Sequence, residues 1–249
     1  MNDAKYLDTL YEELLKEYID KFGTNNKMSC MYHVKGKEYK KNNKRAKILF
    51  VGRAPNGWYE NIHSDKEIND ILDEAKNCDF DLGKIYTNPI GEGLNEKGEK
   101  VKWYYNKSAF WQLVKRVVYL VSPNVGNWSS EIAWTNLFKI APANGGNPSY
   151  DVMLQLIDKS LDILEEEIRV LKPNYVVMVT DVKMDGIDLN KMFEKFNIKR
   201  IEDSFVVGYG LENNIKMIVV KRPEYKTGTR QAQAEKIVSL FNKKLFLST

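Results

Sequence analysis

Side chains that bind metals or form disulfides are scarce in this sequence. Among its 249 residues are only two cysteines, Cys30 and Cys78, and two histidines, His33 and His63. Two cysteines cannot build a disulfide framework, a four-cysteine zinc site or an iron–sulfur cluster. We therefore expect neither a metal nor another cofactor.

The common signatures of nucleotide and hydrolase chemistry are missing as well. The sequence contains no G-x-x-x-x-G-K-[ST] phosphate loop, no G-x-G-x-x-G after a predicted strand, no G-x-S-x-G and no H-E-x-x-H. Their absence disfavours the usual nucleoside-triphosphate hydrolases and dinucleotide-dependent enzymes.

Long apolar runs are also absent. No segment is long and apolar enough to cross a bilayer, and the N-terminal region is charged and amphipathic, unlike a signal peptide. We expect no membrane partner, a cytoplasmic location and a monomer.

The composition is that of an ordinary globular protein. Apolar residues make up 43% of the chain and charged residues 29%, and the net charge is +4. Such a mildly basic balance permits contact with nucleic acid without requiring it.

Hydrophobic periodicity predicts strands that alternate with helices. Apolar residues at helical spacing predict helices at 3–22, 65–77, 108–121, 149–171, 187–196 and 229–245. Continuous apolar runs predict buried strands at 47–51, 131–138, 175–179 and 215–220. This alternation predicts an α/β fold, a three-layer α/β/α sandwich with a mostly parallel central sheet. We expect one domain over residues 1–249, with a core at about 46–245 and the helix 3–22 as an appended element.

Three stretches carry no such pattern. Residues 24–45 are expected to form a loop or short hairpin, residues 78–106 a long surface excursion, and residues 139–148 an irregular loop rich in Gly and Pro. Three polar residues precede predicted helices and are expected to be N-caps, namely Asp65, Ser108 and Ser149.

Polar, proline-containing loops follow three of the predicted strands. They begin with GRAPN at 52–56, with TN at 135–136 and with RPE at 222–224. The carboxyl ends of parallel strands meet at one edge of a sheet, and ligands bind outside that edge. The sequence therefore predicts that these three loops form one site.

The order of these segments resembles the uracil-DNA glycosylase superfamily. GRAPN at 52–56 matches the GEAPG strand end of one branch of that family, and the segment Thr135–Lys139 matches its T-N-x-x-K strand end. An LKP turn follows at 171–173, and Arg222-Pro223 stands where the family has His-Pro. The match in order and spacing covers about residues 46–240.

The resemblance implies a role for each segment. Enzymes of this family extrude a base from the stack and cut its bond to the sugar. The amide at the position of Asn136 would read the edge of the extruded base, whereas the alternative for Asn136 is an amide that ties the following loop together. The expected ligand-binding residues are Gly52, Ala54, Pro55, Trp58, Tyr105, Asn136 and Pro223.

Two charged positions of the family motif have changed. Arg53 replaces the acidic residue of the first motif, and a guanidinium cannot act as a base and repels a sugar cation. Arg222 replaces the histidine and still provides a positive charge for a departing anion. Asn56 is a further residue that could position a water. The candidate catalytic residues of this altered site are therefore Arg53, Asn56 and Arg222.

Three functional hypotheses follow. The first is a divergent glycosylase-like protein that binds DNA or a nucleobase-containing ligand, with altered or lost base-excision activity. The second is a non-catalytic nucleic-acid-binding or regulatory module on the same fold. The third is an unrelated α/β enzyme that uses Arg53 and Arg222 to hold an anionic small molecule. A basic cluster near the predicted site fits either phosphate contact or a solvated surface and comprises Lys221, Arg222, Lys226 and Arg230.

Overall fold

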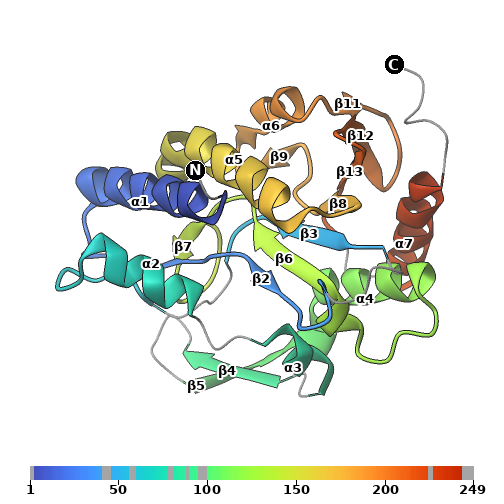
Figure 1. Ribbon diagram of the computed structural model, residues 1–249, viewed down its shortest axis with the longest axis horizontal. Coiled ribbons are helices and arrows are strands. Elements are labelled where there is room, and N and C mark those ends of the chain that lie inside the picture. Colours follow the sequence, from blue (N-terminus) through green and yellow to red (C-terminus); the bar gives the residue numbers. More distant parts are fainter. Residues whose placement is uncertain are drawn as a thin grey trace.

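The chain folds around a mixed β-sheet. The computed structural model describes residues 3–40, 46–55, 60–77, 81–87, 90–94, 100–223 and 227–242, and in these residues seven strands form a sheet of order β11-β12-β13-β8-β3-β6-β2. Its centre consists of parallel strands, namely β3 (Ile48–Gly52), β6 (Ile132–Asn136), β8 (Tyr175–Met178) and β13 (Ile215–Val220) (Figure 1). Its edges are antiparallel and consist of β2 (Val34–Lys35), β11 (Lys199–Arg200) and β12 (Val206–Glu212). The predicted α/β class is confirmed.

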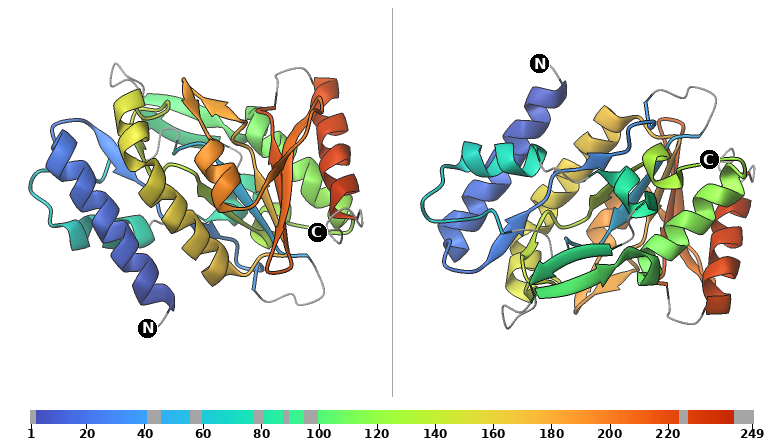
Figure 2. Two further views of the ribbon diagram at one scale, coloured as in Figure 1. Left: turned by 90° about the horizontal axis from the view of Figure 1, so that it is seen from above. Right: turned by 90° about the horizontal axis from the view of Figure 1, so that it is seen from below.

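Helices cover both faces of this sheet. Along β3, Ile48 and Phe50 face one apolar cluster, and Leu49 and Val51 face the other. The first cluster is closed by α4 (Ala109–Val121) and α7 (Thr227–Phe241), and the second by α5 (Tyr150–Leu171) and α6 (Asn190–Lys195) (Figure 2). Burial of both faces explains why the central strands are continuous apolar runs.

A third apolar cluster lies between α5 and the N-terminal segment. It joins α1 (Asp3–Phe22) and α2 (Ile68–Lys76) to one side of α5, and includes residues of β1 (Met28–Cys30) and β7 (Ile140–Pro142), which pair with each other. The predicted helix 3–22 is therefore confirmed, and it packs on the same helix that covers the sheet.

Most predicted helices are present with shifted ends. The helices expected at 108–121 and 149–171 are confirmed as α4 and α5, each capped by the predicted serine. The prediction of Asp65 as a cap was wrong, because α2 begins at Ile68 behind Glu67 and has no side-chain cap. The last helix ends at Phe241, and residues 243–249 lie outside the described part.

Segments that were expected to be irregular contain regular structure. Within 78–106 lie α3 (Leu82–Thr87), a hairpin of β4 (Ile90–Leu94) and β5 (Lys100–Tyr104), and the 3₁₀ helix η1 (Tyr105–Lys107). Residues 139–148 contain β7, and β1 and β2 pair with other strands and not with one another. Such short strands depend on partners distant in sequence, so they leave no periodic signal of their own.

The strand β12 was not predicted at all. Its sequence contains Gly208 and Gly210, which weaken a strand pattern. A Cβ on Gly208 would lie 2.6 Å from Cε1 of Phe193 and 2.7 Å from Cγ2 of Ile198. The glycine is therefore needed because α6 and the segment after it pack directly against the backbone of β12.

Two small elements separate the larger ones. The 3₁₀ helix η2 (Trp128–Glu131) precedes β6, and a hairpin of β9 (Lys183–Met184) and β10 (Ile187–Asp188) follows β8. This hairpin occupies the beginning of the helix predicted at 187–196, so α6 starts later than expected. No helix in the described residues is long and apolar enough to cross a membrane.

The N-cap of α5 provides a test of the fold. The Ser149 hydroxyl accepts a hydrogen bond from the Val152 amide at 3.4 Å. Replacing Ser149 with Ala should lower the free energy of unfolding by about 1 kcal/mol, because an amide of the first turn loses its acceptor. Urea denaturation would measure this loss. Ser239→Ala, an exposed site within α7, serves as the control, and equal stability of the two variants would contradict the prediction.

Candidate functional site

The sheet topology identifies one edge as the place for a ligand. From β3 the chain continues to β6 on one side, and then to β8 and β13 on the other side. The strand order therefore reverses between β3 and β8. In open α/β sheets, ligands bind outside the carboxyl ends of the strands at such a reversal. Arg53 follows β3 and Val179-Thr180 follows β8, so these residues lie at the candidate site.

The first two predicted motifs meet at this edge. Gly52 and Asn136 are direct partners in the β3–β6 ladder, and the Leu137 amide donates to the Gly52 carbonyl at 2.8 Å. A Cβ on Gly52 would lie 2.3 Å from Oδ1 of Asn136 and 3.5 Å from Nε1 of Trp134. Gly52 is therefore required by the close approach of the Asn136 amide and not by an unusual backbone angle.

The Asn136 side chain is buried, with 2% of its surface exposed. Its Nδ2 donates to Sδ of Met31 at 2.9 Å. A thioether sulfur is a weak acceptor, so a ligand carbonyl that reached this amide would be a stronger partner. Asn136 is thus buried at the carboxyl end of β6, and its side-chain donor is held by a weak acceptor.

A buried lysine fixes the position of this strand end. Nζ of Lys139 donates to Oε2 of Glu167 at 2.6 Å, to Oγ1 of Thr135 at 2.8 Å and to the Asn136 carbonyl at 2.6 Å. The side chains of Lys139 and Glu167 are both 0% exposed. Because an ammonium has three donors, Lys139 is fully satisfied by these three acceptors.

The other side of Glu167 connects to the N-terminal segment. Its Oε1 accepts from the Tyr11 hydroxyl at 2.8 Å, and Nδ1 of His33 lies 3.6 Å from the same oxygen. The Thr135 hydroxyl donates to Oε2 at 2.8 Å. The carboxylate therefore joins α5, the end of β6, α1 and the segment between β1 and β2.

The electrostatics of this cluster favour a charged pair. Burial by itself would raise the pKa of Glu167, but the charge of Lys139 and the neighbouring His33 outweigh it and lower the pKa to about 2. Burial lowers the pKa of Lys139, and the charge of Glu167 opposes this. Burial also raises the pKa of the nearby Cys30 thiol to about 12, so Cys30 is not a nucleophile at neutral pH.

Arg53 connects the first motif to the loop after β8. Its Nε donates to the Thr180 carbonyl at 3.1 Å, and its Nη2 donates to the Lys183 carbonyl at 3.3 Å. Burial lowers the pKa of this half-buried guanidinium, and the positive charge of Arg222 lowers it further. The charges of Arg53 and Arg222 therefore act on one another at this edge of the sheet.

The third motif reaches the site through the end of β13. The Asp181 amide donates to the Val220 carbonyl at 3.1 Å, which holds the ends of β8 and β13 together. Arg222 is exposed and Pro223 is buried just beyond this contact. Gly52, Arg53, Asn136 and Arg222 are therefore gathered at one edge, as the sequence predicted for its three loops.

Other predicted residues have different surroundings. Pro55 is buried, and Ala54 packs against the apolar cluster beneath α5. Tyr105 packs against the cluster beneath α4, with its ring edge-to-face to Trp111 at a centroid distance of 6.5 Å. Arg230 is only 3% exposed, so the exposed basic cluster does not include it. Three predicted residues lie outside the described part, namely Asn56, Trp58 and Lys226.

Two acidic residues of the site were missed by the sequence analysis. The charges of Asp181 and Asp185 both act on Arg53 and oppose the effect of Arg222. Asp181 has a left-handed φ of 69°, a conformation that recurs at functional sites, and Asp185 accepts from Nδ2 of Asn147 at 2.6 Å. Both residues follow the predicted strand at 175–179, and a polar segment after a buried strand is a signal that could have identified them. The segment was overlooked because it contains no proline, unlike the other three loops.

The described residues contain no candidate metal-binding site. Among these residues, no group of three or more His, Cys, Asp or Glu side chains is arranged to hold a metal ion.

The buried pair gives a first prediction for the site. Lys139→Met leaves the Glu167 carboxylate buried without its cation and should lower the free energy of unfolding by about 3–5 kcal/mol. Adding Glu167→Leu should restore most of this loss, because the unpaired charge is removed. Urea denaturation of the single and double variants would measure both effects. Lys191→Met, which breaks the exposed pair with Asp158, is the control and should cost less than about 1 kcal/mol.

The same pair predicts a dependence on pH. Because the pKa of Glu167 is lowered to about 2 in the folded protein, its contribution to stability is present above its ordinary pKa near 4.5 and is lost as the pH falls toward 2. The wild type should therefore lose more unfolding free energy across this window than Glu167→Gln does. If the free energy of unfolding fell equally with pH in the wild type and in Glu167→Gln, an ionised and paired Glu167 would be contradicted.

The contact between Gly52 and Asn136 gives a third prediction. Gly52→Ala places a methyl group against Oδ1 of Asn136 and should cost about 1–3 kcal/mol of unfolding free energy. The cost of the same substitution should be smaller in an Asn136→Ala background, where that oxygen is gone. A double-mutant cycle in urea measures the difference, and additive costs would show that the two side chains do not meet.

Comparison with known proteins adds no relative to this picture. No protein-family model matches the chain, and no curated protein sequence matches it either.

Proposed function

We propose that this protein is a divergent relative of the uracil-DNA glycosylases. It binds nucleic acid at the carboxyl edge of the sheet, through contacts to both phosphates and bases. The observation that carries the proposal is the convergence of Arg53 and Arg222 beside the Gly52–Asn136 pair. In this proposal the two arginines attract a phosphate, and the Asn136 amide forms hydrogen bonds with a base.

The strand arrangement supports this relationship. The expected fold is a three-layer α/β/α sandwich, and the four parallel strands stand in the order second, first, third, fourth along the chain. The three motifs that carry the resemblance lie at the ends of the first, second and fourth of these strands. Because these strands are parallel neighbours, all three motifs lie at the same edge of the sheet.

The two guanidinium groups favour an anionic ligand. Burial lowers the pKa of Arg53 most, the charge of Arg222 lowers it further, and the charges of Asp181 and Asp185 act in the opposite direction. Guanidinium groups bind phosphate through paired hydrogen bonds, so a nucleic-acid backbone is a fitting partner.

The same charges disfavour ordinary base excision. Cleavage of the bond between base and sugar develops positive charge on the sugar, and Arg53 stands where the family has its acidic residue. Asp181 is a carboxylate whose charge reaches Arg53 from the neighbouring strand, so any remaining excision activity would depend on it. We therefore expect binding with little or no cleavage.

Binding to a fluorescently labelled single-stranded oligonucleotide tests this proposal. Affinity measured by anisotropy should fall linearly on a plot of log affinity against log salt. Arg222→Ala should weaken binding about tenfold, because one charged hydrogen-bonding group is lost, and should reduce the salt slope by about 0.7. Arg116→Ala on α4 is the matched control and should bind like the wild type.

A parallel assay separates the alternatives. Single-stranded and mismatched DNA with uracil, hypoxanthine or xanthine is incubated with the protein and examined for abasic sites. Binding without abasic sites supports the proposal, and excision that Asp181→Asn abolishes would identify an active glycosylase. Absence of DNA binding, together with thermal stabilisation by a phosphorylated metabolite, would overturn the proposal in favour of a small-molecule enzyme.

A further inference from the structure

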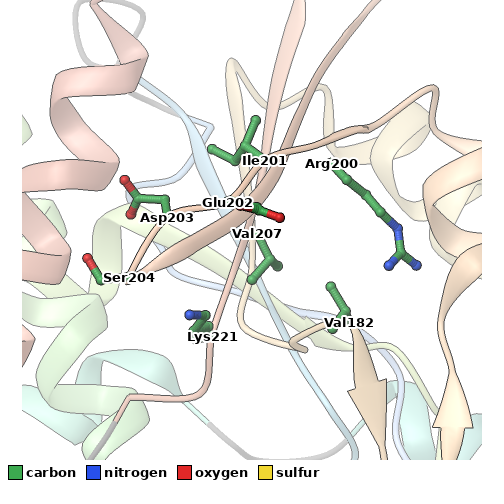
Figure 3. A pocket seen from close by; sticks show the side chains of 8 residues that line it. All are labelled: Val182, Arg200, Ile201, Glu202, Asp203, Ser204, Val207 and Lys221. Atoms are coloured by element: carbon green, nitrogen blue, oxygen red, sulfur yellow. The ribbon is translucent and has the colours of Figure 1, made fainter.

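A groove of about 770 Å³ lies beside the candidate site (Figure 3). It runs between the loop after β8, the connection from β11 to β12 and the residues that follow β13. Val182, Ile201 and Val207 form its apolar part, and charged side chains surround them. Its volume falls within the range of small-molecule sites, and five of its eight lining residues are polar or charged.

The groove and the candidate site share their walls. Val182 lies in the loop whose Thr180 and Lys183 carbonyls hold Arg53. Lys221 lines the groove, and the next residue, Arg222, acts on Arg53. A ligand that extends beyond the two arginines therefore reaches Lys221 and the groove next.

Two of the charged groups in the groove are already engaged. The Arg200 guanidinium pairs with Asp188 at 3.2 Å and lies over the Phe193 ring at 4.8 Å from its centroid. The Asp203 carboxylate pairs with Lys236 at 2.6 Å and also accepts from backbone amides. Because both side chains are already paired within the protein, we assign them a structural role in the wall of the groove.

Two other charged groups remain available to a ligand. Within the described residues, no hydrogen bond or ion pair engages the Lys221 ammonium or the Glu202 carboxylate, and both line the groove. The Lys221 ammonium can donate to a phosphate, and the Glu202 carboxylate can accept only from a donor such as an amino group. Because Glu202 repels phosphate, the interior of the groove suits a neutral group that carries an N–H donor.

We infer that the groove binds a second nucleotide of a single-stranded nucleic acid, next to the nucleotide held at Arg53 and Arg222. Lys221 binds the linking phosphate, the apolar floor contacts the base, and Glu202 accepts a hydrogen bond from its exocyclic amino group. Cytosine, adenine and guanine carry an exocyclic amino group, whereas thymine and uracil carry only carbonyl oxygens as exocyclic polar groups. This inference rests on the proposed function and narrows its ligand from any nucleobase compound to a strand whose base at this position carries an exocyclic amino group.

The test compares oligomers with a mononucleotide. Labelled (dC)8, (dT)8 and (rC)8 are titrated by anisotropy, and dCMP by calorimetry, for the wild type, Lys221→Ala, Glu202→Gln and the distant control Lys16→Ala. Lys221→Ala should weaken oligomer binding about tenfold and lower the salt slope by about 0.7, with dCMP binding unchanged. The wild type should prefer (dC)8 over (dT)8 by about three- to tenfold, the worth of one hydrogen bond.

The glutamine variant isolates the role of the carboxylate. Its amide both donates and accepts, so Glu202→Gln should bind (dC)8 and (dT)8 about equally. A preference for (dC)8 that persists in Glu202→Gln, or oligomer binding that is unchanged in Lys221→Ala, would overturn the inference and leave the proposed function standing. Absence of wild-type binding to any of the probes would instead refute the proposed function. The ratio of (rC)8 to (dC)8 affinity in the wild type identifies which nucleic acid the groove accepts.

Discussion

The buried ion pair between Lys139 and Glu167 is the constraint on which the rest of the candidate site depends. Removing two charges from water costs several kcal/mol for each ion, and only close pairing with full hydrogen bonding offsets this cost. Here the ammonium has three acceptors, and one of them is the backbone carbonyl of Asn136. Such a pair adds little net stability, but it permits few alternative arrangements. The strand end that carries Asn136 is therefore held in one position.

This constraint also changes the role of the N-terminal helix. The sequence alone suggested that α1 is an appendage to a core that begins near residue 46. The Tyr11 hydroxyl, however, donates to Oε1 of Glu167, the carboxylate oxygen to which Lys139 does not donate. Burial raises the pKa of Tyr11 well above its ordinary value, so its hydroxyl stays protonated and keeps donating. The helix is thus part of the support of the site, and its apolar cluster on α5 serves the same geometry.

The sequence predicted the features that local pattern determines and missed those that depend on distant partners. The strands β3, β8 and β13 were identified because both of their faces are buried, and the long helices because their apolar stripes are regular. The strand β12 was missed because contacts from Phe193 and Ile198 require glycine in it. Lys139 was recognised as a motif residue, but its partner was not. Glu167 is the last of three consecutive glutamates, and helix phase alone decides that it is buried against the sheet while Glu165 faces solvent. The approach of Arg53 to Arg222 depends on strand order, and the sequence predicted it only through the general rule that the carboxyl ends of parallel strands meet at one edge.

The charges at the carboxyl edge bear on the proposal that this protein is a relative of the glycosylases. Cleaving a base from its sugar requires stabilisation of positive charge on the sugar and of negative charge on the departing base. Arg53 and Arg222 favour the negative charge and oppose the positive one. Asp181 and Asp185 moderate this bias, but both lie on the loop after β8 and not on the GRAPN loop, so the carboxylates approach Arg53 from another direction. The positive charges of Arg53 and Arg222 act together at this edge, and this is the physical basis for proposing a ligand rich in phosphate.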